Sequence, residues 1–162
     1  MSSCAVPEII REATKADYDA LLSDEAPAGL RLAATEIAPH QILVMLAGVA
    51  DDVRPGFSPT SWLIVDGDRL VGLCSIVKPP SDGVVELGYG IAPSERRHGY
   101  ATKAVAAIAV WARSRPDVTA LAAETSPTNA PSQAVLSVNG FQRVGERIDE
   151  EDGLVYCWRL DT

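Results

Sequence analysis

Residues that bind metals or form disulfides are scarce in this 162-residue sequence, which contains three cysteines and two histidines. Cys4, Cys74 and Cys157 form no CxxC pair, and their odd number does not suit a disulfide framework. His40 and His98 belong to no HExxH motif. We therefore expect neither a zinc ribbon nor a transition-metal site built by the protein.

A long apolar run is also missing. The longest uncharged stretch, residues 37–50, has fourteen residues and contains Pro39, whereas a membrane-spanning helix needs about 20 apolar residues. The opening sequence MSSCAVPEIIRE has no basic segment followed by an apolar one, so we expect no signal peptide. These features predict a cytoplasmic protein with no membrane partner.

Positive charge is in the minority. Lys and Arg number 14 against 22 Asp and Glu, which gives a formal net charge of −8. An acidic surface repels the phosphate backbone, so we expect no nucleic-acid partner. Hydrophobic residues make up 47% and charged residues 22%, which excludes a disordered chain. The length predicts one domain over residues 1–162.

Hydrophobic periodicity and turn signals predict both strands and helices. Strands are expected at residues 9–11, 61–65, 69–77, 84–91, 118–125, 141–147 and 154–160, and helices at 14–22, 42–49, 100–114 and 132–138. Three antiparallel strands in the middle of this order are typical of a mixed sheet and not of a regular βαβ repeat. The sequence therefore predicts an α/β fold with a mixed sheet.

Basic residues gather where an expected strand leads through a short loop into a helix. Arg96, Arg97 and His98 precede Gly99, which has no side chain and lets a ligand approach the backbone closely. The first N–H groups of the following helix lack internal partners and form an anion site. We expect a diphosphate there, although Gly99 as an ordinary loop glycine is the alternative. The motifs GxxxxGK[ST], GxGxxG and GxSxG are absent.

Two segments resemble the GNAT N-acetyltransferase superfamily. Residues 96–101, RRHGYA, match its diphosphate loop, commonly written Q/R-x-x-G-x-G/A. Residues 129–141, NAPSQAVLSVNGF, are similar to the pattern N-x-x-S-x-x-V-L-x-x-x-G-F of the branch that contains ribosomal-protein and many small-molecule acetyltransferases. Residues 10–17 resemble the family's first strand and helix. The resemblance is weakest over residues 25–60, where the family usually determines its substrate specificity.

The resemblance implies a GNAT-like fold, in which a mostly antiparallel twisted sheet, flanked by helices, is splayed to admit acetyl-coenzyme A. It implies direct acetyl transfer to a primary amine on a small molecule or a protein N-terminus, without a covalent enzyme intermediate. Family members often form homodimers, although no feature of this sequence fixes an interface. The residues implied to bind the donor are Gly90, Ile91, Arg96, Arg97, His98, Gly99, Tyr100, Ala101, Thr102, Asn129 and Ser132.

Three residues are candidates for catalysis. Glu86 is the expected general base, acting through water, with a strand carboxylate in a surface ion pair as the alternative. Glu124 is a second candidate, unless it only positions the loop at residues 126–129. Ser132 is expected beside the donor sulfur, where it assists the leaving thiolate, or else it is a helix N-cap. Many family members carry a tyrosine general acid where this chain has Leu136.

Two other functions fit parts of the sequence. A non-catalytic acyl-coenzyme A-binding or sensory domain is favoured by the missing tyrosine. A plain nucleotide-binding module would need only the diphosphate loop. The acceptor also stays open, since the sequence allows ribosomal-protein termini, amino acids, polyamines and aminoglycosides.

Overall fold

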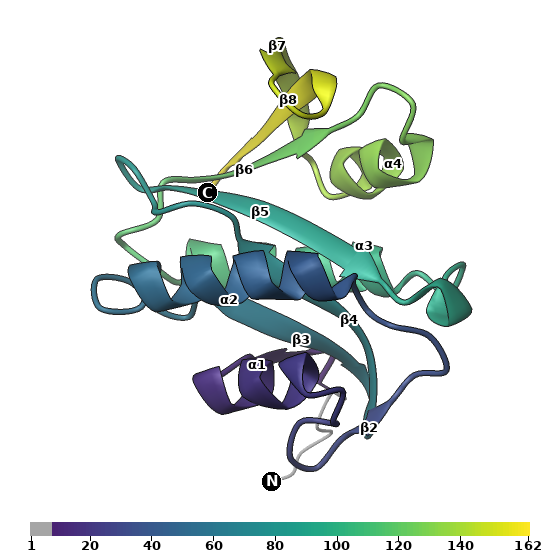
Figure 1. The fold of residues 1–162 in the computed structure, drawn as a ribbon. Coiled ribbons are helices and arrows are strands. Elements are labelled where there is room, and N and C mark those ends of the chain that lie inside the picture. Colours follow the sequence, from purple (N-terminus) through teal and green to yellow (C-terminus); the bar gives the residue numbers. More distant parts are fainter. Residues whose placement is uncertain (1–7) are drawn as a thin grey trace, which may run out of the picture.

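A single eight-stranded sheet organises the chain in the computed structural model, which describes residues 8–162 (Figure 1). Cys4 and the expectation of no signal peptide lie outside the described residues. The strands are β1 (Ile10–Glu12), β2 (Arg31–Leu32), β3 (Ser61–Asp66), β4 (Arg69–Ile76), β5 (Val84–Ile91), β6 (Ala120–Thr125), β7 (Gln142–Asp149) and β8 (Gly153–Asp161). The helices are α1 (Lys15–Leu22), α2 (His40–Val53), α3 (Tyr100–Arg113) and α4 (Ala130–Val138), with a 3-10 turn, η1 (Pro93–Glu95).

The sheet is mixed, as the sequence predicts. Its order is β1-β3-β4-β5-β6-β8-β7, with β2 beside β4. Neighbours are antiparallel except for β2 with β4 and β5 with β6. The pairing of β5 with β6 ends at Leu87 and Ala123, and the rest of β5 pairs only with β4. Beyond Leu87 the two strands diverge toward the end of β5 that leads to α3 (Figure 1). The sheet is therefore splayed at this point.

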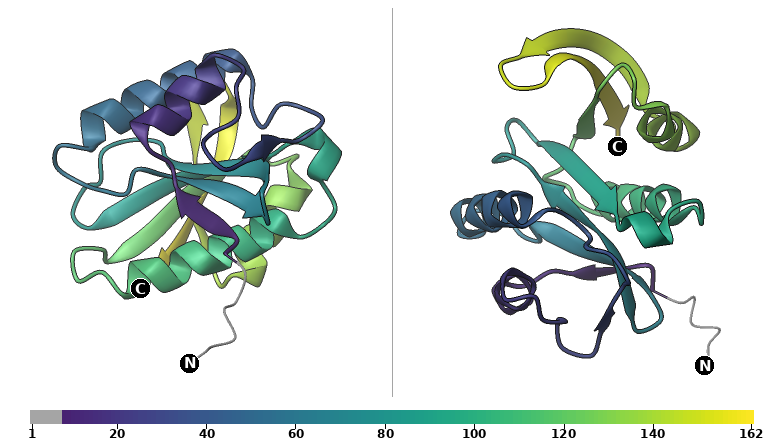
Figure 2. Two further views of the ribbon diagram at one scale, coloured as in Figure 1. Left: turned by 90° about the horizontal axis from the view of Figure 1, so that it is seen from below. Right: turned by 45° about the vertical axis from the view of Figure 1, so that its right-hand side comes forward.

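Each face of the sheet carries its own core. Helices α1 and α2 lie on one face and α3 on the other (Figure 2). On the α3 face, Val105 and Ile108 pack against the sheet in a core that includes Trp62 and the buried Cys74. On the α2 face, the core contains Leu43 and other buried residues of α1, α2, β3 and β4. This arrangement follows from the apolar stripes of the helices, which repeat at helical spacing.

Local signals explain where most elements begin and end. Thr14 and Asp17 form a capping box at α1, with hydrogen bonds of 2.9 and 3.2 Å between side chain and backbone. Gly67 turns the β3–β4 hairpin at a φ of 60°, and Gly140 follows the end of α4 at a φ of 87°. Among residues 8–162, no helix combines the length and the apolar character needed to cross a membrane.

Two helices begin earlier than predicted, and one strand was not predicted. Helix α2 runs from His40 to Val53, longer than residues 42–49, because it begins directly after Pro39 without a side-chain cap. Helix α4 begins at Ala130 because Asn129, not Ser132, is its N-cap. Strand β2 was not predicted, since its two residues are defined only by their pairing with β4.

Candidate functional site

The loop between η1 and α3 presents its backbone to open space. Arg96 is extended, whereas Arg97 and Gly99 have φ values of 69° and 76° in the left-handed region. Gly99 is the N-cap of the 14-residue helix α3, and no side chain caps that helix end. A Cβ atom built on Gly99 would meet no atom within 4 Å. The unpaired N–H groups of this helix end therefore stay accessible to an anion.

These residues form one wall of a cavity of about 530 Å³, which we call the loop cavity. It lies between the loop, the end of β5 and the start of α4. Every residue that the resemblance assigns to donor binding lines it. The lining consists of Tyr89, Gly90, Ile91, Glu95, Arg96, Arg97, His98, Gly99, Tyr100, Ala101, Thr102, Asn129, Pro131, Ser132 and Val135. The structure thus brings two segments about thirty positions apart to one cavity, while their role in binding stays a prediction.

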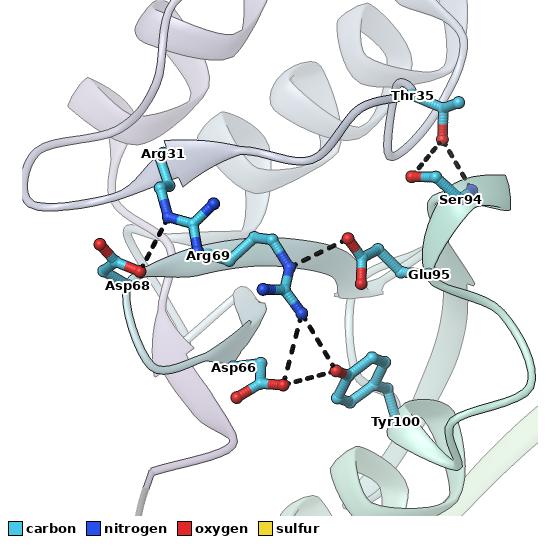
Figure 3. Close-up of polar contacts among 8 residues, drawn as sticks. All are labelled: Arg31, Thr35, Asp66, Asp68, Arg69, Ser94, Glu95 and Tyr100. Carbon is cyan, nitrogen blue, oxygen red and sulfur yellow. Dashed lines mark hydrogen bonds and ion pairs between the residues drawn. The ribbon is translucent and has the colours of Figure 1, made fainter.

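An ionic network anchors both ends of the loop (Figure 3). The Arg69 guanidinium on β4 lies 2.9 Å from the Glu95 carboxylate through Nε and donates to the Tyr100 hydroxyl at 3.4 Å. The contact with Glu95 is an ion pair. Tyr100 donates to Asp66 at 2.5 Å, and this hydrogen bond raises the pKa of the tyrosine. One guanidinium therefore holds the residue before the loop and the residue after it.

Two further contacts fix the neighbourhood of this network. Thr35, in the segment before α2, accepts a hydrogen bond from the backbone N–H of Ser94 at 2.9 Å (Figure 3). Asn139, at the end of α4, donates to the Thr102 carbonyl at 3.2 Å. The η1 turn is thus attached to the segment before α2, and the first turn of α3 is attached to the end of α4.

A tyrosine and a serine meet at the far wall of the loop cavity. The hydroxyl groups of Tyr89 on β5 and Ser132 on α4 lie 2.9 Å apart. Burial raises the pKa of Tyr89 to about 12. The Tyr89 hydroxyl group is therefore protonated at neutral pH. Sequence reasoning left Tyr89 unassigned, because only the packing of α4 against β5 brings these side chains together.

Asn129 shapes the same wall as the N-cap of α4. Its Oδ1 atom accepts the Ser132 backbone N–H at 3.2 Å. The alternative interpretation of Ser132 as an N-cap was therefore wrong. The cap leaves the Ser132 hydroxyl available for its contact with Tyr89.

A second cavity, of about 590 Å³, lies on the α2 face of the sheet, and we call it the α2 cavity. Tyr89, Gly90, Ile91 and Arg96 line both cavities. The remaining lining residues are Thr35, Glu36, Ile37, Ala38, Pro39, Ile42, Met45, Leu46, Leu73, Val77, Gly88 and Pro93. The two cavities therefore meet at the half of β5 that does not pair with β6.

The two carboxylates singled out in the sequence lie outside both sets of lining residues. Glu86 Oε1 is 3.2 Å from Lys78 Nζ, and its side chain is 17% exposed. Glu124 accepts two hydrogen bonds from Arg147, one of them 2.7 Å long. Both carboxylates are thus paired with a cation, and their catalytic role stays a prediction. Among residues 8–162, no group of three or more His, Cys, Asp or Glu side chains is arranged to hold a metal ion.

Sequence reasoning also missed Arg69, which carries the network around the loop. Its partners Glu95 and Tyr100 lie 26 and 31 positions further along the chain. No local pattern connects such positions, because the pairing of β4 with β5 decides their proximity.

Comparison with known proteins identifies relatives of this chain. A family model described as acetyltransferase (GNAT) domain matches residues 9–142. The curated protein named uncharacterized N-acetyltransferase YjdG, from Bacillus subtilis (strain 168), is 34% identical over 84 residues. That match covers 50% of each protein, so the chain spans about half the length of this relative.

Two solved structures are similar over almost the whole chain. The ribosomal-protein-alanine N-acetyltransferase of Brucella melitensis is 22% identical with a TM-score of 0.67, over 96% of this chain and 100% of that one. The aminoglycoside acetyltransferase AAC(6')-Ib, solved in complex with coenzyme A, is 18% identical with a TM-score of 0.65. This second match covers 94% of this chain and 93% of that one. At these identities the similarity establishes the fold.

Proposed function

Because the chain belongs to the GNAT acetyltransferase family, we propose that it transfers the acetyl group of acetyl-coenzyme A to a primary amine. The observation that carries this proposal is the loop cavity, where a basic loop, an open glycine and a helix N-terminus converge. Coenzyme A in the complex of the similar aminoglycoside enzyme supports the choice of donor. The residues present also fit the donor, since Arg96 and Arg97 supply positive charge and Gly99 leaves room for phosphate oxygens.

In the proposed reaction the thioester carbonyl carbon exchanges its bond to sulfur for a bond to the amine nitrogen. The ammonium form of the acceptor loses two protons, one to solvent and one to the sulfur. The products are an amide and coenzyme A with a free thiol. Each proton transfer needs a group in this chain, and the carbonyl oxygen needs a hydrogen-bond donor as its charge grows.

We assign the first proton transfer to Glu86, acting through water, with Glu124 as the second candidate base. Lys78 Nζ lies 3.2 Å from Glu86 Oε1, so the proposed base has a cation beside it. Residues 88–91 of β5 do not pair with β6. Backbone N–H groups on that edge are therefore free to donate a hydrogen bond to the carbonyl oxygen.

For the second proton we propose the pair formed by Ser132 and Tyr89. Their hydroxyl groups are hydrogen-bonded to each other on the wall shared with the end of β5. Tyr89 is protonated at neutral pH, and because burial raises its pKa and makes it a weaker acid than a free tyrosine, its hydroxyl is suited to hold the Ser132 hydroxyl in place. This pair offers a proton donor in a chain with Leu136 at the position of the family's usual tyrosine.

The test is turnover with the purified chain. Acetyl-coenzyme A and a panel of primary amines are supplied, and the release of thiol is compared with the mass of the amine. We expect thiol release that depends on the amine, together with an amine heavier by one acetyl group. Tight binding of acetyl-coenzyme A without product from any amine would favour the sensory domain. Stronger binding of ADP than of coenzyme A would favour a nucleotide-binding module.

A further inference from the structure

We propose that the acceptor is a primary amine on an apolar carbon skeleton without a second positive charge. This inference rests on the proposed acetyl transfer and names the substrate class for it. It starts from the α2 cavity, which shares the wall of Tyr89, Gly90, Ile91 and Arg96 with the loop cavity. An amine at the shared wall faces the proposed donor, and the rest of the acceptor extends into the α2 cavity. The volume of about 590 Å³ is in the range of small-molecule sites.

The lining of the α2 cavity is mostly apolar. Aliphatic side chains from α2, from the segment before it and from β4 form the surface away from β5: Ile37, Ala38, Ile42, Met45, Leu46 and Leu73. Only Glu36 and Arg96 carry charge at neutral pH among the lining residues, and their signs are opposite. A ligand with several ammonium groups would find one carboxylate there. An apolar skeleton would find matching surface over most of its length.

The two carboxylates proposed as bases add no charge to the lining of the α2 cavity. Glu86 is paired with Lys78 and Glu124 with Arg147, so their charge is already compensated. Neither residue lines the α2 cavity. The formal net charge of −8 belongs to the whole chain and by itself gives no reason to expect a polycation in this cavity.

Two apolar side chains of α2 are exposed to solvent at this cavity. Met45 is 51% exposed and Ile42 is 36% exposed, and both line the cavity. An apolar ligand would remove their surfaces from water, which strengthens binding roughly fourfold for each buried methylene group. A second ammonium group beside Ile42 and Met45 would lose its hydration against apolar surface, and Glu36 is the one carboxylate of the lining that could offset the loss. The two effects act in the same direction.

A matched pair of amines tests the inference. Hexylamine and hexamethylenediamine have the same carbon chain and differ by one terminal ammonium group. With the full chain and acetyl-coenzyme A, we expect kcat/KM to be roughly tenfold or more higher for hexylamine, because the diamine must desolvate its second charge. Equal rates, or a preference for the diamine, would overturn the substrate class while leaving acetyl transfer intact. Absence of product from both amines and from the wider panel would overturn the transfer itself, and the inference with it.

Two substitutions on α2 test whether the α2 cavity produces the preference for hexylamine. Met45→Glu adds a carboxylate to the cavity lining and should reduce the preference for hexylamine by roughly tenfold, since it offers the second ammonium a partner. Val44→Glu is the control, because Val44 is 50% exposed on the same helix but does not line the cavity. It should keep the preference of the parent protein. An equal response of the two variants would show that the α2 cavity does not select the acceptor. Thermal unfolding of both variants checks that the comparison is made on folded protein.

Discussion

Replacing Gly99 by alanine tests the loop cavity most directly. Gly99 has a φ of 76° at the N-terminus of α3, and a Cβ atom there would project into open space. The substitution therefore has two separable effects. It strains the backbone of the protein without ligand, and it fills the space where we expect the diphosphate to approach the helix N–H groups.

The size of each effect follows from this geometry. A residue with a Cβ atom in the left-handed region costs about 1–2 kcal/mol, which for a domain of this length lowers Tm by roughly 2–8 °C. A methyl group that displaces one phosphate oxygen from a backbone N–H removes a charge-assisted hydrogen bond of about 1.5–3 kcal/mol. The dissociation constant for coenzyme A should then rise roughly 10- to 150-fold.

Gly153→Ala separates the two effects. Gly153 is the first residue of β8 and has a φ of 73°, and a Cβ atom there also meets nothing within 4 Å. It does not line the loop cavity. Both variants should lose similar stability in thermal unfolding, whereas only Gly99→Ala should lose affinity for coenzyme A in calorimetry. Parental affinity in a folded Gly99→Ala protein would refute the assignment of the loop.

Three further predictions concern the network, the base and the proton donor. Tyr100→Phe removes the hydroxyl that connects Asp66 with Arg69 and should weaken coenzyme A binding roughly 2- to 10-fold. The control is Asp68→Asn, which breaks only the neighbouring ion pair with Arg31 and should leave the affinity for coenzyme A unchanged. Glu86→Gln should lower kcat about 10²- to 10⁴-fold, most strongly at low pH, with little change in the affinity for coenzyme A. Lys78→Gln is the matched variant, because it removes the ion pair but keeps the carboxylate. A full rate in Glu86→Gln would eliminate Glu86 as the base. Tyr89 should titrate near 12, so the stability from its neutral form is present below its unfolded pKa of about 10 and is lost as pH rises toward 12. Tyr89→Phe should therefore flatten the alkaline loss of stability, and a tyrosinate absorbance step near 10 for this residue would contradict the burial argument.

The parts of the fold that local chemistry determines were predictable from the sequence. The capping box at Thr14 and the glycine after α4 act within a few residues, so neighbouring residues in the sequence are enough to determine them. The mixed sheet followed from the order of the apolar segments. Contacts between distant positions were not predictable, because the sheet register and helix packing create them. The hydrogen bond from Tyr89 to Ser132 spans 43 positions, and Arg69 reaches the two ends of the loop from another strand.

The sequence Gly88-Tyr89-Gly90 explains why the two cavities meet where they do. Successive residues of a strand point to opposite faces of the sheet. Tyr89 points toward α4 and reaches Ser132, whereas the two glycines leave the α2 face of β5 without side chains. A Cβ atom on Gly88 would lie 2.9 Å from the Val77 side chain, so this bare face is also tightly constrained. The pairing with β6 ends just before these residues. One short segment thus supplies an open backbone edge, the tyrosine of the proposed proton-donating pair on one face and the proposed acceptor site on the other.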